Sequence, residues 1–428
     1  MPSSIDRLSA FPDDVLCHIL SFLPTKISVS TSILARRWRF LWAHVPNLHL
    51  VHDREELKIE TIYNKILLLY KVKNMNAFCL SSDDTKRSGS HLEACIEDVI
   101  NRNVKELDLS FVILNCFPSC IFTCRTVVDM KLSGCGYIPM TDDICLPALK
   151  KLCLSWVRYG SDESLPFLLS RCPVLEELTV HRLSADVACL IVSSRTIHKL
   201  VLNSSFVDHC DTNDGYTVKI DAPEVRYLKV RDFVSKEVSA GSLASLIEAD
   251  DALNNEAPME EDDLYARSVL EFVGCLSNVK YLKLSTGLID VSVWVSDSEF
   301  STWTVKYNNL IKLELRGDWR FIPNFLENAD NLEALIICTD NVNLKYWIEP
   351  KEVPSCLLSH LGIVRIDYFE CEDQEFHMIK YILRNGKVLK RMEIYSKCYG
   401  IDLEKKSEAL KRISLFPRGS VECELAFH

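Results

Sequence analysis

The sequence predicts an α/β protein with three parts: a short all-helical N-terminal segment, an irregular repeat solenoid with a parallel sheet on its concave side, and a C-terminal α/β cap. Three observations predict this fold. Helical patterns fill residues 1–50, a leucine-based pattern recurs through residues 101–345, and amphipathic helices alternate with strand-like runs in residues 354–428. With 428 residues, the chain is long enough for two or three domains.

The N-terminal segment contains a helix start at Pro12, because proline suits the first helical position and two aspartates follow it in the first turn. Pro24 ends this helix, and a second helical pattern runs from Thr25 to Pro46. A unit this small buries too little surface to be stable alone, so its apolar stripes need a partner inside or outside the chain. The apolar residues of the first helix recur at helical spacing: Val15, Leu16, Ile19, Leu20 and Leu23.

The middle of the chain repeats a short pattern, L-x-x-L-x-L or a near variant, that predicts one strand per repeat. Successive central residues are 23, 22, 26, 22, 28, 54, 31 and 22 positions apart, and we expect a degraded repeat within residues 242–253 to divide the longest step. This period is typical of leucine-rich repeats, in which helices or loops cover the convex side. A conventional α/β domain with separate helices is the alternative. The central residues are Leu107, Met130, Leu152, Leu178, Leu200, Leu228, Leu282, Leu313 and Leu335.

Two regions depart from the repeat pattern. Residues 51–100 are predicted to form a helical linker or N-terminal cap, within which residues 81–90 form an exposed loop. Residues 248–263 hold eight acidic residues and no basic one, so we expect a solvated or disordered loop there. A contact with a substrate is the alternative for this acidic stretch.

The C-terminal segment, residues 354–428, alternates strand-like and helical patterns. A helix is predicted over Phe376–Leu383, ended by the Asn385-Gly386 pair, and a second amphipathic helix is stopped at Pro417. The runs IVRIDYF and VLKRMEIYS repeat the strand pattern of the middle region. We expect these units to cap the open edge of the solenoid.

Composition excludes several functional classes. The 49 basic and 60 acidic residues give a net charge of −11, which argues against general binding to nucleic acid or to an anionic membrane. The sequence has neither an apolar run long enough for a transmembrane helix nor a secretory signal. We therefore expect the 18 cysteines to be reduced and the protein to be cytoplasmic, nuclear or both.

No motif for chemistry stands out. The sequence lacks the phosphate-binding, dinucleotide-binding, zinc-protease and nucleophile-elbow patterns. Cys116, Cys120 and Cys124 are spaced four apart, but a metal finger needs a second ligand cluster, so core thiols are the better interpretation. We expect no catalytic residue, no metal site and no cofactor. A hydrolase or transferase would have only the unassigned cysteines to support it.

The stretch from Asp6 to Trp42 closely resembles an F-box in the form found in plant proteins. The motifs that carry the resemblance include FPDD, LPTK and ARRWRFLW, and Phe11 stands where the family usually has leucine. The resemblance implies docking on the Skp-type adaptor of a cullin–RING ubiquitin ligase. It implies these adaptor-binding residues: Phe11, Pro12, Val15, Leu16, Ile19, Leu20, Leu23, Leu34, Trp38, Leu41 and Trp42.

Two further motifs resemble the same group of plant proteins. The stretch CPVLEELTV, in which Cys172 is expected to be a buried thiol, is typical of plant F-box repeat proteins. The C-terminal segment resembles the FBD domain through Cys356-Leu357-Leu358, Tyr381-Ile382-Leu383 and the run FPRGS. Together these resemblances imply an F-box, an irregular leucine-rich-repeat solenoid and an FBD-type cap.

The outward positions of the predicted concave sheet are locally basic. If each central leucine points into the core, its neighbours between Leu200 and Leu315 point outward, and six of these are basic while one is acidic. Lysine and arginine beside tyrosine suit an acidic or phosphorylated peptide. The alternatives are that these cations only keep the sheet surface soluble, or that the acidic stretch covers them. The predicted substrate-binding residues are Lys199, Tyr227, Lys229, Arg231, Tyr281, Lys283, Lys312 and Arg316.

The function implied is therefore that of a non-catalytic substrate-recognition subunit of an SCF-type ubiquitin ligase. The F-box would dock the adaptor, and the repeats would hold a protein substrate close to the ubiquitin-transferring machinery. The alternative is a leucine-rich-repeat scaffold that binds proteins without promoting their degradation.

Overall fold

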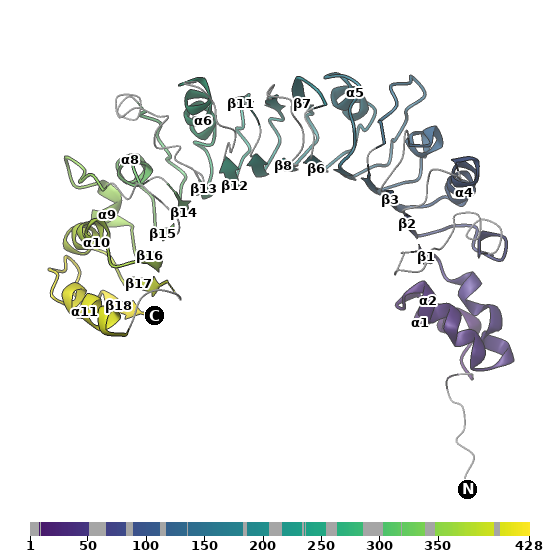
Figure 1. Cartoon of the computed structure of the whole chain (residues 1–428), viewed down its shortest axis with the longest axis horizontal. Coiled ribbons are helices and arrows are strands. Elements are labelled where there is room, and N and C mark those ends of the chain that lie inside the picture. Colours follow the sequence, from purple (N-terminus) through teal and green to yellow (C-terminus); the bar gives the residue numbers. More distant parts are fainter. Residues whose placement is uncertain are drawn as a thin grey trace, which may run out of the picture. The chain divides into compact units, whose positions relative to one another are not determined.

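The computed structural model describes residues 8, 10–50, 66–82, 89–111, 117–134, 136–182, 186–204, 216–232, 235, 237–253, 263–285, 303–317, 319–338, 347–397 and 403–428. The chain divides into two compact units, Met1–Val187 and Ala188–His428. Each unit contains a parallel sheet, and helices accompany its strands (Figure 1).

The first unit begins with short helices. Pro12 and Pro24 directly precede the first two, so each proline sets a helix start. The second helical pattern is divided, because Ala35 is extended, with φ −159° and ψ 162°, and separates two 3-10 helices. The elements are α1 (Asp13–Ser21), α2 (Thr25–Ser30), η1 (Thr31–Ile33) and η2 (Arg36–His44).

The sheet of the first unit pairs its described strands in chain order. The predicted central residues are aligned and buried, since Leu107 is opposite Met130, Met130 opposite Leu152, and Leu152 opposite Leu178. The sheet starts before residue 101, because two strands precede the predicted repeat region. Within the predicted loop 81–90, residues 83–88 lie outside the described residues. The strands are β1 (Asn47–Leu50), β2 (Ala77–Ser82), β3 (Glu106–Phe111), β4 (Asp129–Ser133), β5 (Lys151–Ser155) and β6 (Glu177–Arg182), with α4 (Gly89–Asn101), η4 (Ser119–Thr123) and α5 (Ser164–Ser170) between them.

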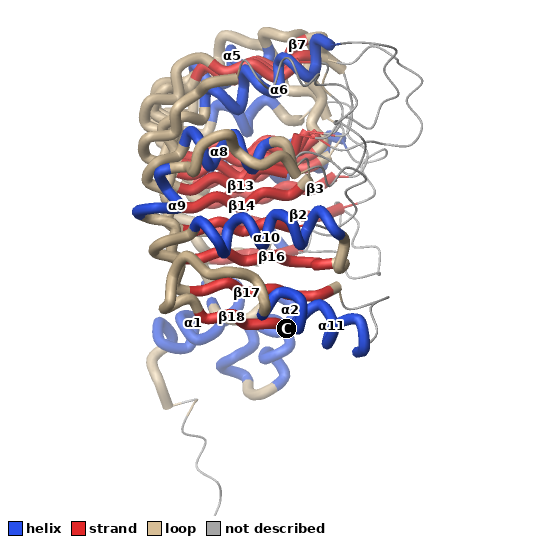
Figure 2. The backbone as a smooth tube through the Cα atoms, turned by 90° about the vertical axis from the view of Figure 1, so that its left-hand side faces the viewer, coloured by secondary structure: helices blue, strands red, loops and turns tan. Residues whose placement is uncertain are grey.

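The second unit repeats this arrangement over nine described strands. Its helices lie along one face of the sheet, and the other face, called the open face here, carries no helix in the described part of this unit (Figures 1 and 2). A separate three-stranded sheet has the order β11-β9-β7. The main strands are β8 (Lys199–Ser204), β10 (Tyr227–Asp232), β12 (Glu248–Leu253), β13 (Tyr281–Ser285), β14 (Lys312–Arg316), β15 (Ala334–Cys338), β16 (Ile363–Phe369), β17 (Arg391–Ser396) and β18 (Glu424–Phe427). The remaining elements are β7 (Cys189–Ser193), β9 (Thr217–Asp221), β11 (Glu237–Ala240), α6 (Asp263–Cys275), α8 (Phe321–Asn328), α9 (Ser355–Ser359), α10 (Asp373–Asn385) and α11 (Leu403–Ser414).

Strand β12 is the degraded repeat expected between Leu228 and Leu282, and its presence confirms that prediction. Ala249 takes the place of the central leucine, opposite both of those residues. The prediction of an acidic loop is therefore wrong for residues 248–253. The neighbouring strands β10 and β13 supply backbone hydrogen-bond partners, and these outweigh the low strand propensity of the acidic residues. Residues 254–262 lie outside the described residues, and α6 begins at Asp263.

The C-terminal segment continues the sheet of the second unit, since β16 pairs with β15 and β17 pairs with β16. Helix α10 is longer than predicted at both ends, and a capping box between Glu372 and Glu375 fixes its start. Helix α11 ends at Ser414, three residues before the predicted stop. The segment thus adds strands to the repeat sheet.

Candidate protein-interaction surfaces

Helix α1 carries two apolar stripes, one buried and one exposed. Leu16 and Leu20 are fully buried against the 3-10 helix η2. Val15 and Ile19, one position earlier in each turn, are 40% and 37% exposed. A helix that buries one apolar stripe and exposes a second is available to another surface.

Exposed apolar side chains also lie outside α1, and we call the whole set the helical apolar face. Sequence reasoning missed several of its members. Helical spacing could have found Phe22, three residues after Ile19, but no sequence signal places Ile33, at 88% exposed, outside the core. The face comprises Phe11, Pro12, Val15, Ile19, Phe22, Leu23, Ile27, Val29, Ile33 and Leu34.

Five of the eleven predicted adaptor-binding residues are buried, and their contact with an adaptor stays a prediction. A forty-residue segment needs its largest apolar side chains for its own core, so these five support the exposed residues from inside. The buried five are Leu16, Leu20, Trp38, Leu41 and Trp42. The exposed six are Phe11, Pro12, Val15, Ile19, Leu23 and Leu34.

Polar contacts hold the short helices in place. Arg37 on η2 forms an ion pair with Asp13 at the start of α1, at 2.7 Å between Nη2 and Oδ1. The Ser28 hydroxyl on α2 donates to the carbonyl oxygen of Leu20 at 3.0 Å. The backbone N–H of His49 donates to the Thr25 hydroxyl at 2.8 Å, which ties α2 to strand β1. These bonds orient the helical apolar face.

The eight predicted substrate-binding residues all lie at outward positions of β8, β10, β13 and β14. In each strand they alternate with buried residues such as Leu228 and Val230. The strand register brings them side by side, so Tyr227 is opposite Lys199 and Tyr281 is opposite Lys312. The Nζ atom of Lys199 lies 5.7 Å from the centre of the Tyr227 ring, a cation–π contact.

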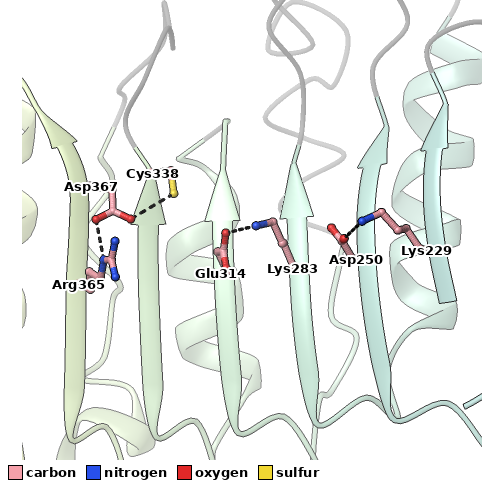
Figure 3. A network of polar contacts seen from close by, with 7 residues as sticks. All are labelled: Lys229, Asp250, Lys283, Glu314, Cys338, Arg365 and Asp367. Atoms are coloured by element: carbon pink, nitrogen blue, oxygen red, sulfur yellow. Dashed lines mark hydrogen bonds and ion pairs between the residues drawn. The ribbon is translucent and has the colours of Figure 1, made fainter. Parts of the chain in front are cut away.

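The predicted basic patch is interrupted by acids, which corrects its expected charge. Strand β12 places Glu248 and Asp250 between the basic strands β10 and β13, so three acidic residues stand among the six basic ones. Asp250 pairs with Lys229, and Glu314 pairs with Lys283 (Figure 3). Binding of an acidic or phosphorylated segment here stays a prediction, with two of its cations already paired.

The same row of charges continues along the open face. On β16, Arg365 Nε lies 2.7 Å from Asp367 Oδ1, and the Cys338 thiol on β15 points to the other oxygen of Asp367 at 3.9 Å (Figure 3). The Arg365 guanidinium also lies 4.5 Å from the centre of the Tyr395 ring. Ion pairs on this face thus form both between neighbouring strands and within one strand.

A hollow of about 360 Å³ opens on this face between β12, β13 and β14. Burial is the main cause that raises the pKa of Tyr227 at its side, and the charges of Asp250 and Glu248 add to the effect. Its lining combines three carboxylates, two ammonium groups and one phenol ring. The lining residues are Glu248, Ala249, Asp250, Tyr281, Leu282, Lys283, Lys312 and Glu314.

Two cysteines of the described residues are buried and unreactive. Burial raises the pKa of the Cys95 and Cys172 thiols to about 12, so both stay protonated and unreactive at neutral pH. Cys172 is buried as predicted, whereas Cys116 lies outside the described residues. Within the described ranges, no three His, Cys, Asp or Glu residues are grouped to hold a metal ion. No helix in the described part of the chain is long and apolar enough to cross a membrane.

Comparisons with known proteins match all three parts of the chain. Residues 8–50 match the F-box domain, residues 92–337 match the LRR repeats of FBD-associated F-box protein At5g56370, and residues 349–394 match the FBD domain. The F-box/FBD/LRR-repeat protein At5g56420 of Arabidopsis thaliana is 29% identical over the full length of both chains. The putative F-box/FBD/LRR-repeat protein At5g22670 of the same plant is 30% identical over 99% of this chain and 98% of its own.

The fold defines a modular chain of helical segment, repeat strands and C-terminal segment, with exposed apolar side chains on the first of these. The chain belongs to the family of F-box/FBD/LRR-repeat proteins. Its predicted order of F-box, leucine-rich repeats and FBD is confirmed, and F-box domains generally bind Skp-type adaptors.

Proposed function

We propose that this chain is the substrate-recognition subunit of an SCF-type E3 ubiquitin ligase. The observation that carries the proposal is the helical apolar face, where Val15, Ile19 and Ile33 are exposed. The helical segment that bears this face, residues 1–50, is too small to be stable without a partner surface. Its position within the F-box match supports a Skp-type adaptor as the partner of this face.

The protein acts in this proposal by holding two partners at once. The helical apolar face binds the adaptor and through it the cullin–RING ligase, while the open face of the repeats binds a protein substrate. Transfer of ubiquitin becomes faster because the bound substrate is kept at a high local concentration near the enzyme that carries activated ubiquitin. The chain itself supplies no catalytic group to that transfer. The cytoplasm or nucleus is the proposed compartment, since both keep thiols reduced.

Titration of a purified Skp-type adaptor into the full-length chain tests the proposal. We expect wild type to bind, and a Val15→Ser, Ile19→Ser double variant to bind at least tenfold more weakly, because both changes remove exposed apolar contact area. Leu68→Ser is the matched control, since Leu68 is 68% exposed in the same unit but lies outside the F-box match.

Three results would reject the adaptor role: no binding by wild type, equal weakening by the Leu68 control, or unchanged binding by the double variant. Adaptor binding without adaptor-dependent loss of a bound protein in cells would instead favour the non-degradative scaffold. Hydrogen exchange of the α1 amides, unchanged in the double variant, would show that its helix remains folded.

A further inference from the structure

Five neighbouring strands of the second unit each place one outward residue in a single register row, which we call the tyrosine row. At its centre is Glu248 on β12, and a tyrosine lies next to it on each side, Tyr227 on β10 and Tyr281 on β13. A lysine stands beyond each tyrosine, Lys199 on β8 and Lys312 on β14. The row is therefore symmetric in chemistry, with a carboxylate flanked by two rings and then by two cations.

The central carboxylate is available to a partner. Glu248 is exposed, and it forms no ion pair with any other described residue. The next row along the strands differs, because there Asp250 holds Lys229 and Glu314 holds Lys283 (Figure 3). The neighbouring row is thus neutralised within the sheet, whereas the tyrosine row keeps a carboxylate for a ligand.

The surroundings of Glu248 suit a cation. The hollow of about 360 Å³ is lined by Glu248 and Tyr281, and Glu248 is the lining carboxylate that no described lysine holds, since Asp250 pairs with Lys229 and Glu314 pairs with Lys283. The face of a tyrosine ring attracts a cation through its quadrupole. The chain shows this property in the same row, because the ammonium group of Lys199 lies 5.7 Å from the centre of the Tyr227 ring.

We propose that the tyrosine row binds a protein segment in which one lysine or arginine enters the hollow beside Glu248 and Tyr281, and acidic residues on both sides reach Lys199 and Lys312. This inference rests on the proposed substrate-binding role of the repeats and is independent of adaptor docking. Each lysine is two strand spacings from Glu248, about 9.6 Å. An extended peptide covers that distance in about three residues.

Binding of labelled peptides to the full-length chain, followed by fluorescence anisotropy, tests the inference. The probes are three 13-residue Gly/Ser peptides with glutamates three residues before and after the centre, and with Arg, Ser or Glu at the centre. We expect the Arg peptide to bind about five- to twentyfold more tightly than the Ser peptide, and the Glu peptide to bind most weakly.

Two variants locate the site. Glu248→Gln and Tyr281→Leu should each lower the preference for the Arg peptide about fivefold or more, because the first removes the charge and the second removes the ring. Glu408→Gln is the matched control, since Glu408 is an exposed acid on α11 and does not line the hollow. It should leave all three affinities unchanged.

Four results would overturn the inference: no binding of any probe, equal binding of the Arg and Ser peptides, tightest binding of the Glu peptide, or an unchanged preference in Glu248→Gln. Adaptor titrations on the same proteins separate the two proposals. Lost adaptor binding with an intact Arg preference rejects the ligase role and leaves the tyrosine row standing, and the converse rejects the tyrosine row alone.

Discussion

Lys229 on β10 and Asp250 on β12 occupy the same register position, and the lysine Nζ lies 2.5 Å from the aspartate Oδ2. Both side chains are mostly buried, with 22% and 18% of their area exposed, so the pair is less screened than a free surface salt bridge. The pair links the degraded repeat to its regular neighbour. It therefore stabilises the sheet where the apolar repeat pattern is weakest.

Reversing one charge of this pair should lower the stability of the protein, and reversing both charges should restore part of the loss. Lys229→Glu or Asp250→Lys alone should lower the free energy of unfolding by about 1–2 kcal/mol, because each places like charges side by side. The double variant Lys229→Glu, Asp250→Lys should recover at least half of the summed loss, since the attraction is restored. Urea unfolding of the four proteins measures this coupling, and strictly additive losses would show that the two side chains do not interact.

Leu20 and Ile19 are adjacent in α1 but should respond differently to truncation. Leu20→Ala should cost about 2–4 kcal/mol of stability, because it opens a cavity in the core formed with Trp38 and Leu41. Ile19→Ala should change stability by less than about 1 kcal/mol and act on adaptor binding instead. Hydrogen exchange of the α1 amides and adaptor titration separate the two effects. Equal exchange rates in both variants would contradict this assignment.

The sequence predicted the repeat fold well because its signal is periodic and redundant. One aligned leucine or methionine per strand is enough to place the sheet, and Leu107, Met130 and Leu152 are aligned as expected. The degraded repeat could be counted from the step between Leu228 and Leu282, but its outward acids could not be placed, because composition favoured a loop over a strand. The charge of the candidate site was misjudged for that reason.

The helical segment shows a different limit. Leu16 and Ile19 are equally apolar and lie on one helix, so periodicity identifies both without telling which stripe faces η2. Tertiary packing determines that Leu16 is buried and Ile19 is exposed. The main contact is Trp38, whose position depends on the break in the helical pattern at Ala35. No short-range pattern signals that break.

Asp251 should make the stability of the second unit depend on pH. It points inward from β12 and is fully buried, and Oδ1 accepts the backbone N–H of Val230 at 3.2 Å. Oδ2 accepts no hydrogen bond from another described residue. Burial raises the pKa of this carboxyl well above its usual value, with a smaller contribution from the charge of Asp250.

The sign of the effect follows from linkage. The folded state holds the proton of Asp251 more tightly than the unfolded state, so the contribution to stability is full below the unfolded pKa of about 4 and is lost as the pH rises through the folded pKa. Asp251→Asn removes this loss. The variant should gain on the order of 1 kcal/mol or more over wild type at pH 8 and little at pH 3, in urea unfolding at both pH values. A difference that does not change with pH would contradict the assignment.

Glu375 should be the residue on which the start of α10 depends most. It is fully buried, and Oε2 accepts the backbone N–H groups of Glu370 at 3.0 Å and Glu372 at 2.9 Å. Glu375→Ala removes the acceptor of these part-buried hydrogen bonds and should cost about 1–3 kcal/mol, whereas Glu375→Gln keeps one acceptor oxygen and should cost less. Glu404→Ala is the control, since Glu404 is exposed in the first turn of α11. Hydrogen exchange of the first α10 amides should rise in the order wild type, Gln, Ala; no difference between Ala and wild type would show that the capping box is dispensable.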